Sequence, residues 1–145
     1  MRVRSPALVL LVAVCACTQS RPFPLGTLEG ISRIAVQNPV GADTAHVISS
    51  PEQIARAVAA VRSVPTGWKH PVTTVPVGHV AAEFYRDTVL VGVVWLGLDY
   101  IIARASERPL IRSASPDELA RLAEAFEVPR KVIVVPPRAE RGDST

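Results

Sequence analysis

Three side chains in the middle of the chain have types that could perform acid–base chemistry on a small-molecule or cell-wall substrate. His79, Glu83 and Tyr85 lie in one segment with the alternation of a strand, and their even separations place all three on one face. Residues four apart on a strand lie about 13 Å apart, which is too far for His79 and Glu83 to share a metal ion. This group supports one of two possible functions, that of a small enzyme or enzyme inhibitor.

Other catalytic and metal-binding patterns are not found in the sequence. The three histidines His46, His70 and His79 have no metal-ligating partner at the spacings that build a site on one element. The chain has no Gly-x-Ser-x-Gly, no Walker loop, no dinucleotide fingerprint and no Ser-x-x-Lys. Asp87 and Asp99 fit turns, where their side chains bond local backbone amides. We therefore expect no catalytic residue, no metal and no cofactor.

A loop rich in proline holds the candidate binding site. Trp68, Lys69 and His70 follow Gly67 within residues 64–77, which contain three prolines. Tryptophan is frequent at interface hot spots, so an exposed Trp68 would anchor a protein partner. The alternative is that Trp68 folds back to fill the end of the core. Trp95 and Tyr100 could extend the surface, but core packing explains them better.

The first seventeen residues carry the clearest functional signal. Arg2 and Arg4 precede a short apolar run at residues 7–14, and Cys17 follows directly after a small alanine. This stretch resembles the signal peptide and lipobox of bacterial lipoproteins. The resemblance implies cleavage before Cys17, a diacylglycerol (with fatty acids such as palmitate) on its thiol and often a further acyl chain on its freed amino group.

Two alternatives to this anchor remain open. Cys15 also lies in the motif, but the bulkier Val14 precedes it, which favours Cys17 as the lipid-bearing residue. An ordinary secretory signal, cut at a small-residue site, is the second alternative. The apolar run is about half of the roughly 20 residues that a membrane-spanning helix needs. We therefore expect a lipid-anchored protein in the cell membrane or outer membrane, facing the periplasm or the exterior.

Charge and cysteine content narrow the classes of partner. The chain has 16 basic and 13 acidic residues, and the loss of Arg2 and Arg4 with the signal brings the two nearly into balance. The basic residues are scattered, which argues against nucleic-acid binding. After cleavage Cys17 would be the last cysteine, so the domain would depend on its apolar core rather than on disulfides. An envelope protein is the expected partner.

Composition divides the chain into four parts. Residues 1–16 form the signal peptide, and residues 17–26, with two prolines, form a lipidated tether. Residues 27–135 are long enough for one α+β domain with a modest core. Residues 136–145 are polar and rich in proline, which predicts a disordered tail.

Two helices are predicted from similar starting signals. Ser50 and Ser115 each precede a proline and stand three residues before Gln53 and Glu118, the pattern of an N-cap serine with a capping box. Apolar residues then recur at helical spacing in both segments. The first helix is expected to end near Ser63, before the proline-rich loop.

Short alternating segments predict the strands of an antiparallel sheet. Residues 89–96 are apolar on both faces, which predicts a central strand or an exposed face that meets a partner or the bilayer. Residues 131–135 could form an edge strand, the surface of a purely structural self-associating protein, or a tail covering the sheet. The other expected strands are residues 31–37, 45–49, 80–85 and 100–104.

These expectations combine into one fold and one leading function. The fold class is a two-layer α+β domain, with an antiparallel sheet of four to six strands and two helices packed on one face. The leading function is a membrane-anchored lipoprotein of the bacterial cell envelope with a non-catalytic binding or accessory domain.

Overall fold

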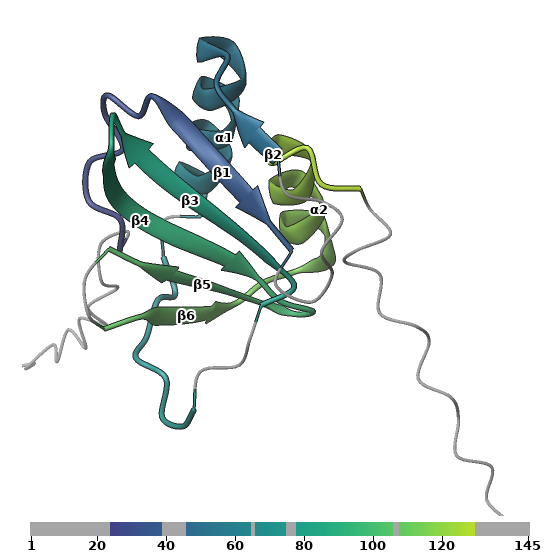
Figure 1. The fold of residues 1–145 in the computed structure, drawn as a ribbon. Coiled ribbons are helices and arrows are strands. Elements are labelled where there is room, and N and C mark those ends of the chain that lie inside the picture. The colour runs from purple at the N-terminus through teal and green to yellow at the C-terminus, as the bar shows by residue number, and fades with distance from the viewer. Residues whose placement is uncertain (1–23, 39–45, 65, 75–77, 106–107, 130–145) are drawn as a thin grey trace, which may run out of the picture.

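The computed structural model describes residues 24–38, 46–64, 66–74, 78–105 and 108–129. Within these ranges the chain forms one six-stranded sheet and two helices, and both helices lie on the same face of the sheet (Figure 1). The predicted two-layer α+β fold is confirmed. In chain order the elements are β1 (Arg33–Gln37), β2 (His46–Ile48), α1 (Pro51–Arg62), β3 (Val80–Arg86), β4 (Val89–Leu96), β5 (Tyr100–Arg104), β6 (Leu110–Ser113) and α2 (Pro116–Ala125).

The sheet is antiparallel throughout, in the order β2-β1-β3-β4-β5-β6. β4 lies inside it, paired with β3 on one side and β5 on the other, so the prediction of a central strand is confirmed. The β3–β4 register runs from Val80↔Leu96 to Arg86↔Val89 and shifts by one residue between Phe84 and Tyr85.

The core fills the space between the sheet and the two helices. Phe84 of β3 meets Phe126, just after α2, edge to face with ring centroids 6.1 Å apart. Both rings are fully buried, and each such side chain contributes roughly 1.5 to 3 kcal/mol through removal of apolar surface from water. The helices contribute one apolar stripe each, made of Ile54, Ala57 and Val61 from α1 and Leu119, Leu122 and Ala123 from α2.

The two helices begin differently, although their sequences are alike. At α2 the capping box is complete, since Ser115 Oγ accepts from the Glu118 amide at 3.2 Å and Glu118 accepts from the Ser115 amide at 2.8 Å. The hydrogen bond from the Ser115 amide holds the pKa of the Glu118 carboxyl below its usual range. The Arg112 guanidinium, 2.9 Å from Glu118 Oε1, acts in the same direction. The second predicted capping box, at Ser50, is wrong.

At the start of α1 the side chains of Ser50 and Gln53, which were expected to form a capping box, donate hydrogen bonds to carboxylates instead. Ser50 Oγ donates to Glu52 at 3.2 Å, and the amide of Gln53 donates to Glu127 beyond the end of α2. Ser50 therefore makes no side-chain cap to the helix amides. The helix still starts where predicted, because Pro51 at its first position and the apolar stripe are enough to fix it.

The described strands differ from the predicted ones at both sides of the sheet. β1 begins two residues later than expected, and β2 is shorter than residues 45–49. β6 was not predicted at all. It has only four residues, and it is held by β5 on one side and by a bridge to Lys69 on the other, where the two backbone hydrogen bonds with Ile111 are 3.0 and 2.9 Å long.

The folded part of the chain starts earlier than predicted. Leu25, placed in the tether by its sequence neighbours, is only 2% exposed and packs so closely on Gly92 that a Cβ there would overlap it.

Several predicted features lie outside the described residues, namely Cys17, the segment 131–135 and the tail 136–145. In the ranges that are described, neither helix has the length and apolar character needed to cross a bilayer.

Candidate functional site

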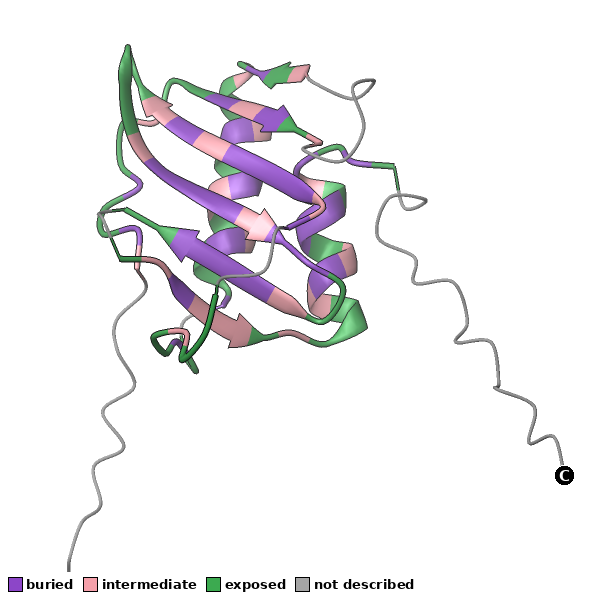
Figure 2. Cartoon of the chain, turned by 60° about the horizontal axis from the view of Figure 1, so that its bottom comes forward, coloured by how far each residue is buried: buried purple, intermediate pink, exposed green. Residues whose placement is uncertain are grey.

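The sheet face opposite the helices carries rows of aromatic, charged and apolar side chains. These residues alternate with the core positions along each strand, and Figure 2 shows their face with both helices behind it. We call this surface the helix-free face. The strand register places its residues in two rows, one of Ala35, Glu83, Val93 and Arg104 and one of Gln37, Ala81, Trp95, Ile102 and Ile111.

The middle of the helix-free face is an apolar floor. Ala81, Val93 and Ile102 are 7%, 3% and 1% exposed, although they do not belong to the main core beneath the helices. They come from three of the four inner strands, β3, β4 and β5.

One polar network joins β1 to β3 on this face. The Tyr85 hydroxyl donates to Glu83 Oε2 at 2.7 Å, and the amide of Gln37 donates to the same oxygen at 3.2 Å. The guanidinium carbon of Arg33 lies 4.1 Å from the centroid of the Tyr85 ring. A cation over an aromatic ring within about 6 Å is attracted by the ring electrons. Four side chains are therefore held in one arrangement.

The hydrogen bond between Tyr85 and Glu83 makes this pair a poor acid–base device. It raises the pKa of the Tyr85 hydroxyl above its usual value near 10, with smaller contributions from burial and from the Glu83 charge, while Arg33 opposes the shift. Tyr85 therefore stays neutral and donates its proton to the hydrogen bond. Such a pair orders a surface rather than activates a nucleophile.

A second cation–aromatic pair joins β4 to β5. The guanidinium carbon of Arg104 lies 5.2 Å from the centroid of the Trp95 ring. The chain entering β3 packs on Trp95, because a Cβ added at Gly78 would lie 2.7 Å from Trp95 Cβ. Trp95 is half-buried on the helix-free face, so the expectation that it packs in the core is wrong.

The three side chains suggested for catalysis are only partly brought together. Glu83 and Tyr85 are hydrogen-bonded, but His79 precedes β3, at the opposite end of that strand from Tyr85. The backbone amide of His79 donates to the carbonyl of Leu96 at 2.7 Å, which fixes it at the far end of the sheet. The structure therefore does not assemble the acid–base group.

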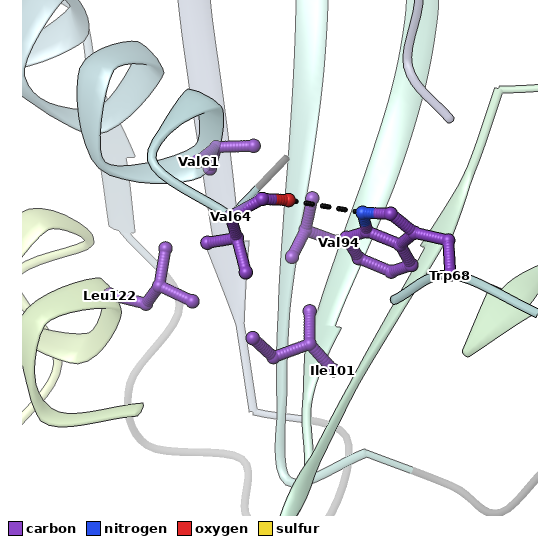
Figure 3. A pocket seen from close by; sticks show the side chains of 6 residues that line it. All are labelled: Val61, Val64, Trp68, Val94, Ile101 and Leu122. Carbon is purple, nitrogen blue, oxygen red and sulfur yellow. Dashed lines mark hydrogen bonds between the residues drawn. The ribbon is translucent and has the colours of Figure 1, made fainter. Parts of the chain in front are cut away.

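The Trp68 loop is placed against the core. Trp68 is 5% exposed, and its Nε1 donates to the carbonyl of Val64 at 3.0 Å (Figure 3). With five apolar neighbours it lines a cavity of about 10 Å³, too small for a ligand. Of the two alternatives for Trp68, the structure shows the side chain that fills the end of the core and not the exposed anchor, whereas Lys69 and His70 are exposed beside it.

An open groove lies between the two helices, away from the helix-free face. It encloses about 320 Å³ and brings together two arginines and two glutamates, Arg56, Arg121, Glu124 and Glu127, with Ala125. Charges of both signs line it, so its field does not favour one class of ion. Within the described ranges no three His, Cys, Asp or Glu side chains gather in a way that could hold a metal ion.

Comparison with known proteins gives no relative for this chain. No family model, no curated protein and no solved structure matches it. The chemistry of the helix-free face is therefore interpreted from its own residues. These are two guanidinium groups on aromatic rings, one carboxylate with two donors, and a buried apolar floor.

Proposed function

We propose that this chain is a lipoprotein of the bacterial cell envelope, anchored through Cys17, whose domain binds another envelope protein with the helix-free face. The charged and apolar start of the chain and the position of Cys17 after a small residue support the anchor. The domain acts as a binding or accessory module and not as a catalyst.

The single observation that carries the binding role is the pair of cation–aromatic contacts on a face that no helix covers. Arg33 lies over Tyr85 and Arg104 over Trp95, and Trp95 lies between Ala81 and Ile102 of the apolar floor. Arginine, tyrosine and tryptophan are the residues most enriched among interface hot spots. Their presence together on a helix-free surface favours a protein partner.

The side chains of the helix-free face are already held in place, which favours binding. Binding costs free energy for every flexible side chain that must be immobilised, about 0.5 to 1.5 kcal/mol each. On this face Tyr85 is already bonded to Glu83, and Trp95 is already packed against the chain at Gly78. A partner would therefore meet a surface whose aromatic groups are pre-organised.

The chemistry of the partner follows from the charges. Arg33 of β1 and Arg104 of β5 are exposed, and Glu83 lies on β3 between those two strands, with two hydrogen bonds to its Oε2. A protein surface with acidic groups spaced to meet the two guanidinium groups would be complementary. The two cavities described above do not involve these residues.

Site-specific photocrosslinking in intact cells tests this proposal. p-Benzoylphenylalanine in place of Ala35 puts the reactive group on the helix-free face, and the same residue in place of Ala59 puts it on the exposed side of α1. We expect a discrete crosslinked protein from the Ala35 variant that Trp95→Ala removes. Equal crosslinking from the Ala59 variant, or none from either, would contradict the proposal.

A further inference from the structure

Two strongly exposed apolar side chains are neighbours at the turn between β3 and β4. Val89 is 64% exposed and Leu90 is 44% exposed. Asp87 begins the turn with a φ of 54°, and the turn forms the exposed tip at the upper left of Figure 2. Adjacent apolar residues on a projecting turn gain free energy when an apolar surface covers them.

The N-terminal segment leaves the domain at this same end of the sheet. Arg86, at the end of β3, donates to the carbonyl of Glu29 at 2.7 Å and to that of Thr27 at 3.4 Å. Leu25 packs on Gly92, near the start of β4. Residues 25–29, the described residues that come soonest after Cys17 in the chain, therefore lie beside the β3–β4 turn and not at the opposite end of the sheet.

The length of chain before the described domain limits where an anchored domain can sit. Pro24 is seven positions after Cys17, a stretch that spans at most about 25 Å when fully extended. The opposite turn, at Gly97, lies one strand further away, and a strand of this length adds roughly another 25 Å. Lipid on Cys17 would thus bring the β3–β4 end within reach of the bilayer.

The charges around this end suit a lipid head-group layer. Arg86 at the end of β3 and Arg108 before β6 are exposed there. The acidic residues Glu29 and Asp87 lie in the described turns at this end, and the sequence places Glu107 next to Arg108. Basic side chains beside exposed apolar ones are the combination that binds an anionic membrane surface.

We infer that Val89 and Leu90 insert into the head-group region of the membrane that carries the acyl chains of Cys17. This inference rests on the proposed anchoring. With the turn in the lipid, the strands stand away from the bilayer, and the helix-free face is directed sideways, where an envelope protein can reach it.

Lipid-dependent quenching at single cysteines tests the inference. In the full-length acylated protein the Cys17 thiol is blocked and Cys15 leaves with the signal, so Leu90→Cys carries the only thiol for an environment-sensitive fluorophore. Leu98→Cys is the matched control, because Leu98 is 41% exposed on the opposite turn. The probe membrane is a phosphatidylethanolamine and phosphatidylglycerol vesicle with shallow spin-labelled lipid.

Each result supports or overturns the inference. We expect intact mass to show the acyl chains, strong quenching at position 90 and none at position 98. An acylated protein without quenching at position 90, or with equal quenching at both positions, overturns the inference and leaves the anchor intact. A fluorophore at position 90 that leaves water as the protein concentration rises, with or without lipid, would show that a second copy covers the turn. That result also overturns the inference. An unacylated protein overturns the anchoring and the inference together.

Discussion

The guanidinium carbon of Arg33 lies 4.1 Å from the centroid of the Tyr85 ring, directly across the β1–β3 pair. The Tyr85 hydroxyl in turn donates to Glu83, so the tyrosine is held from its ring face and from its oxygen. Both partners lie on the helix-free face. The contact therefore fixes an aromatic group on the surface that we propose as the binding site.

Ionisation of Tyr85 should report this arrangement. Its pKa is raised above the usual value near 10, first by the hydrogen bond to Glu83. We expect Glu83→Gln to lower the pKa of Tyr85 towards the usual value and Arg33→Met to raise it further, as followed by the tyrosine ring resonances in NMR. Shifts in the opposite directions would show that the network is not formed in solution.

The raised pKa of Tyr85 also determines how the free energy of unfolding changes with pH. A tyrosine with a raised pKa binds its proton more tightly in the folded state, so its stabilising effect is complete below the usual pKa and is lost as the pH rises through the raised one. Tyr85→Phe should remove this loss from the pH dependence of unfolding. Tyr100, whose pKa is raised by burial, remains as an internal comparison.

Removal of the Trp68 side chain should cost much of the stability of the domain. Trp68 is buried against Val64, so Trp68→Ala is expected to lower the free energy of unfolding by about 3 to 5 kcal/mol. The neighbouring Lys69→Ala, on an exposed side chain, should change it by less than about 0.5 kcal/mol. Denaturant titration measures both, and similar small losses would mean that the loop leaves the core in solution.

The two helix starts provide a matched pair of substitutions. Ser115 caps α2 with its side chain, so Ser115→Ala should lower the free energy of unfolding by about 1 kcal/mol. Ser50 makes no such cap, and Ser50→Ala should have a clearly smaller effect. Equal losses in urea titration would indicate that Ser50 also caps its helix in solution.

The end of α2 holds a residue that is not suited to its backbone conformation. Glu127 has a φ of 56°, with the Val128 amide donating to Ala123 at 2.8 Å and its own amide donating to Glu124 at 3.0 Å. Glycine is the usual residue at this position of such a helix end. Glu127→Gly and Glu127→Ala both lose the hydrogen bond from Gln53, but only glycine relieves the strain. We therefore expect the free energy of unfolding of Glu127→Gly to exceed that of Glu127→Ala by about 0.5 to 1 kcal/mol, as measured by thermal unfolding.

Local signals explain which elements could be predicted from the sequence. The helices were found because Ser-Pro starts and apolar periodicity are written into neighbouring residues. β6 was missed because its four residues carry little pattern, and its pairing partners β5 and Lys69 come from different parts of the chain. The buried state of Trp68 likewise depends on Val94 and Ile101, which the sequence around the loop does not reveal.

The helix-free face illustrates the same limit for the candidate site. Alternation already placed Glu83 and Tyr85 on one side of a strand. The contribution of Arg33 required the knowledge that β1 pairs with β3, and that of Arg104 required the pairing of β4 with β5. Pairing across strands is a long-range property, so neither contact could be inferred from residue spacing.

The central claim is that the chain is held on a membrane through Cys17. The most direct measurement is metabolic labelling with a fatty acid, together with the intact mass of the expressed full-length protein and of its Cys17→Ser and Cys15→Ser variants. The account predicts a labelled protein that begins at Cys17, persists in the Cys15→Ser variant and is lost in the Cys17→Ser variant. A chain that carries no fatty acid, or that keeps its label without Cys17, would contradict it.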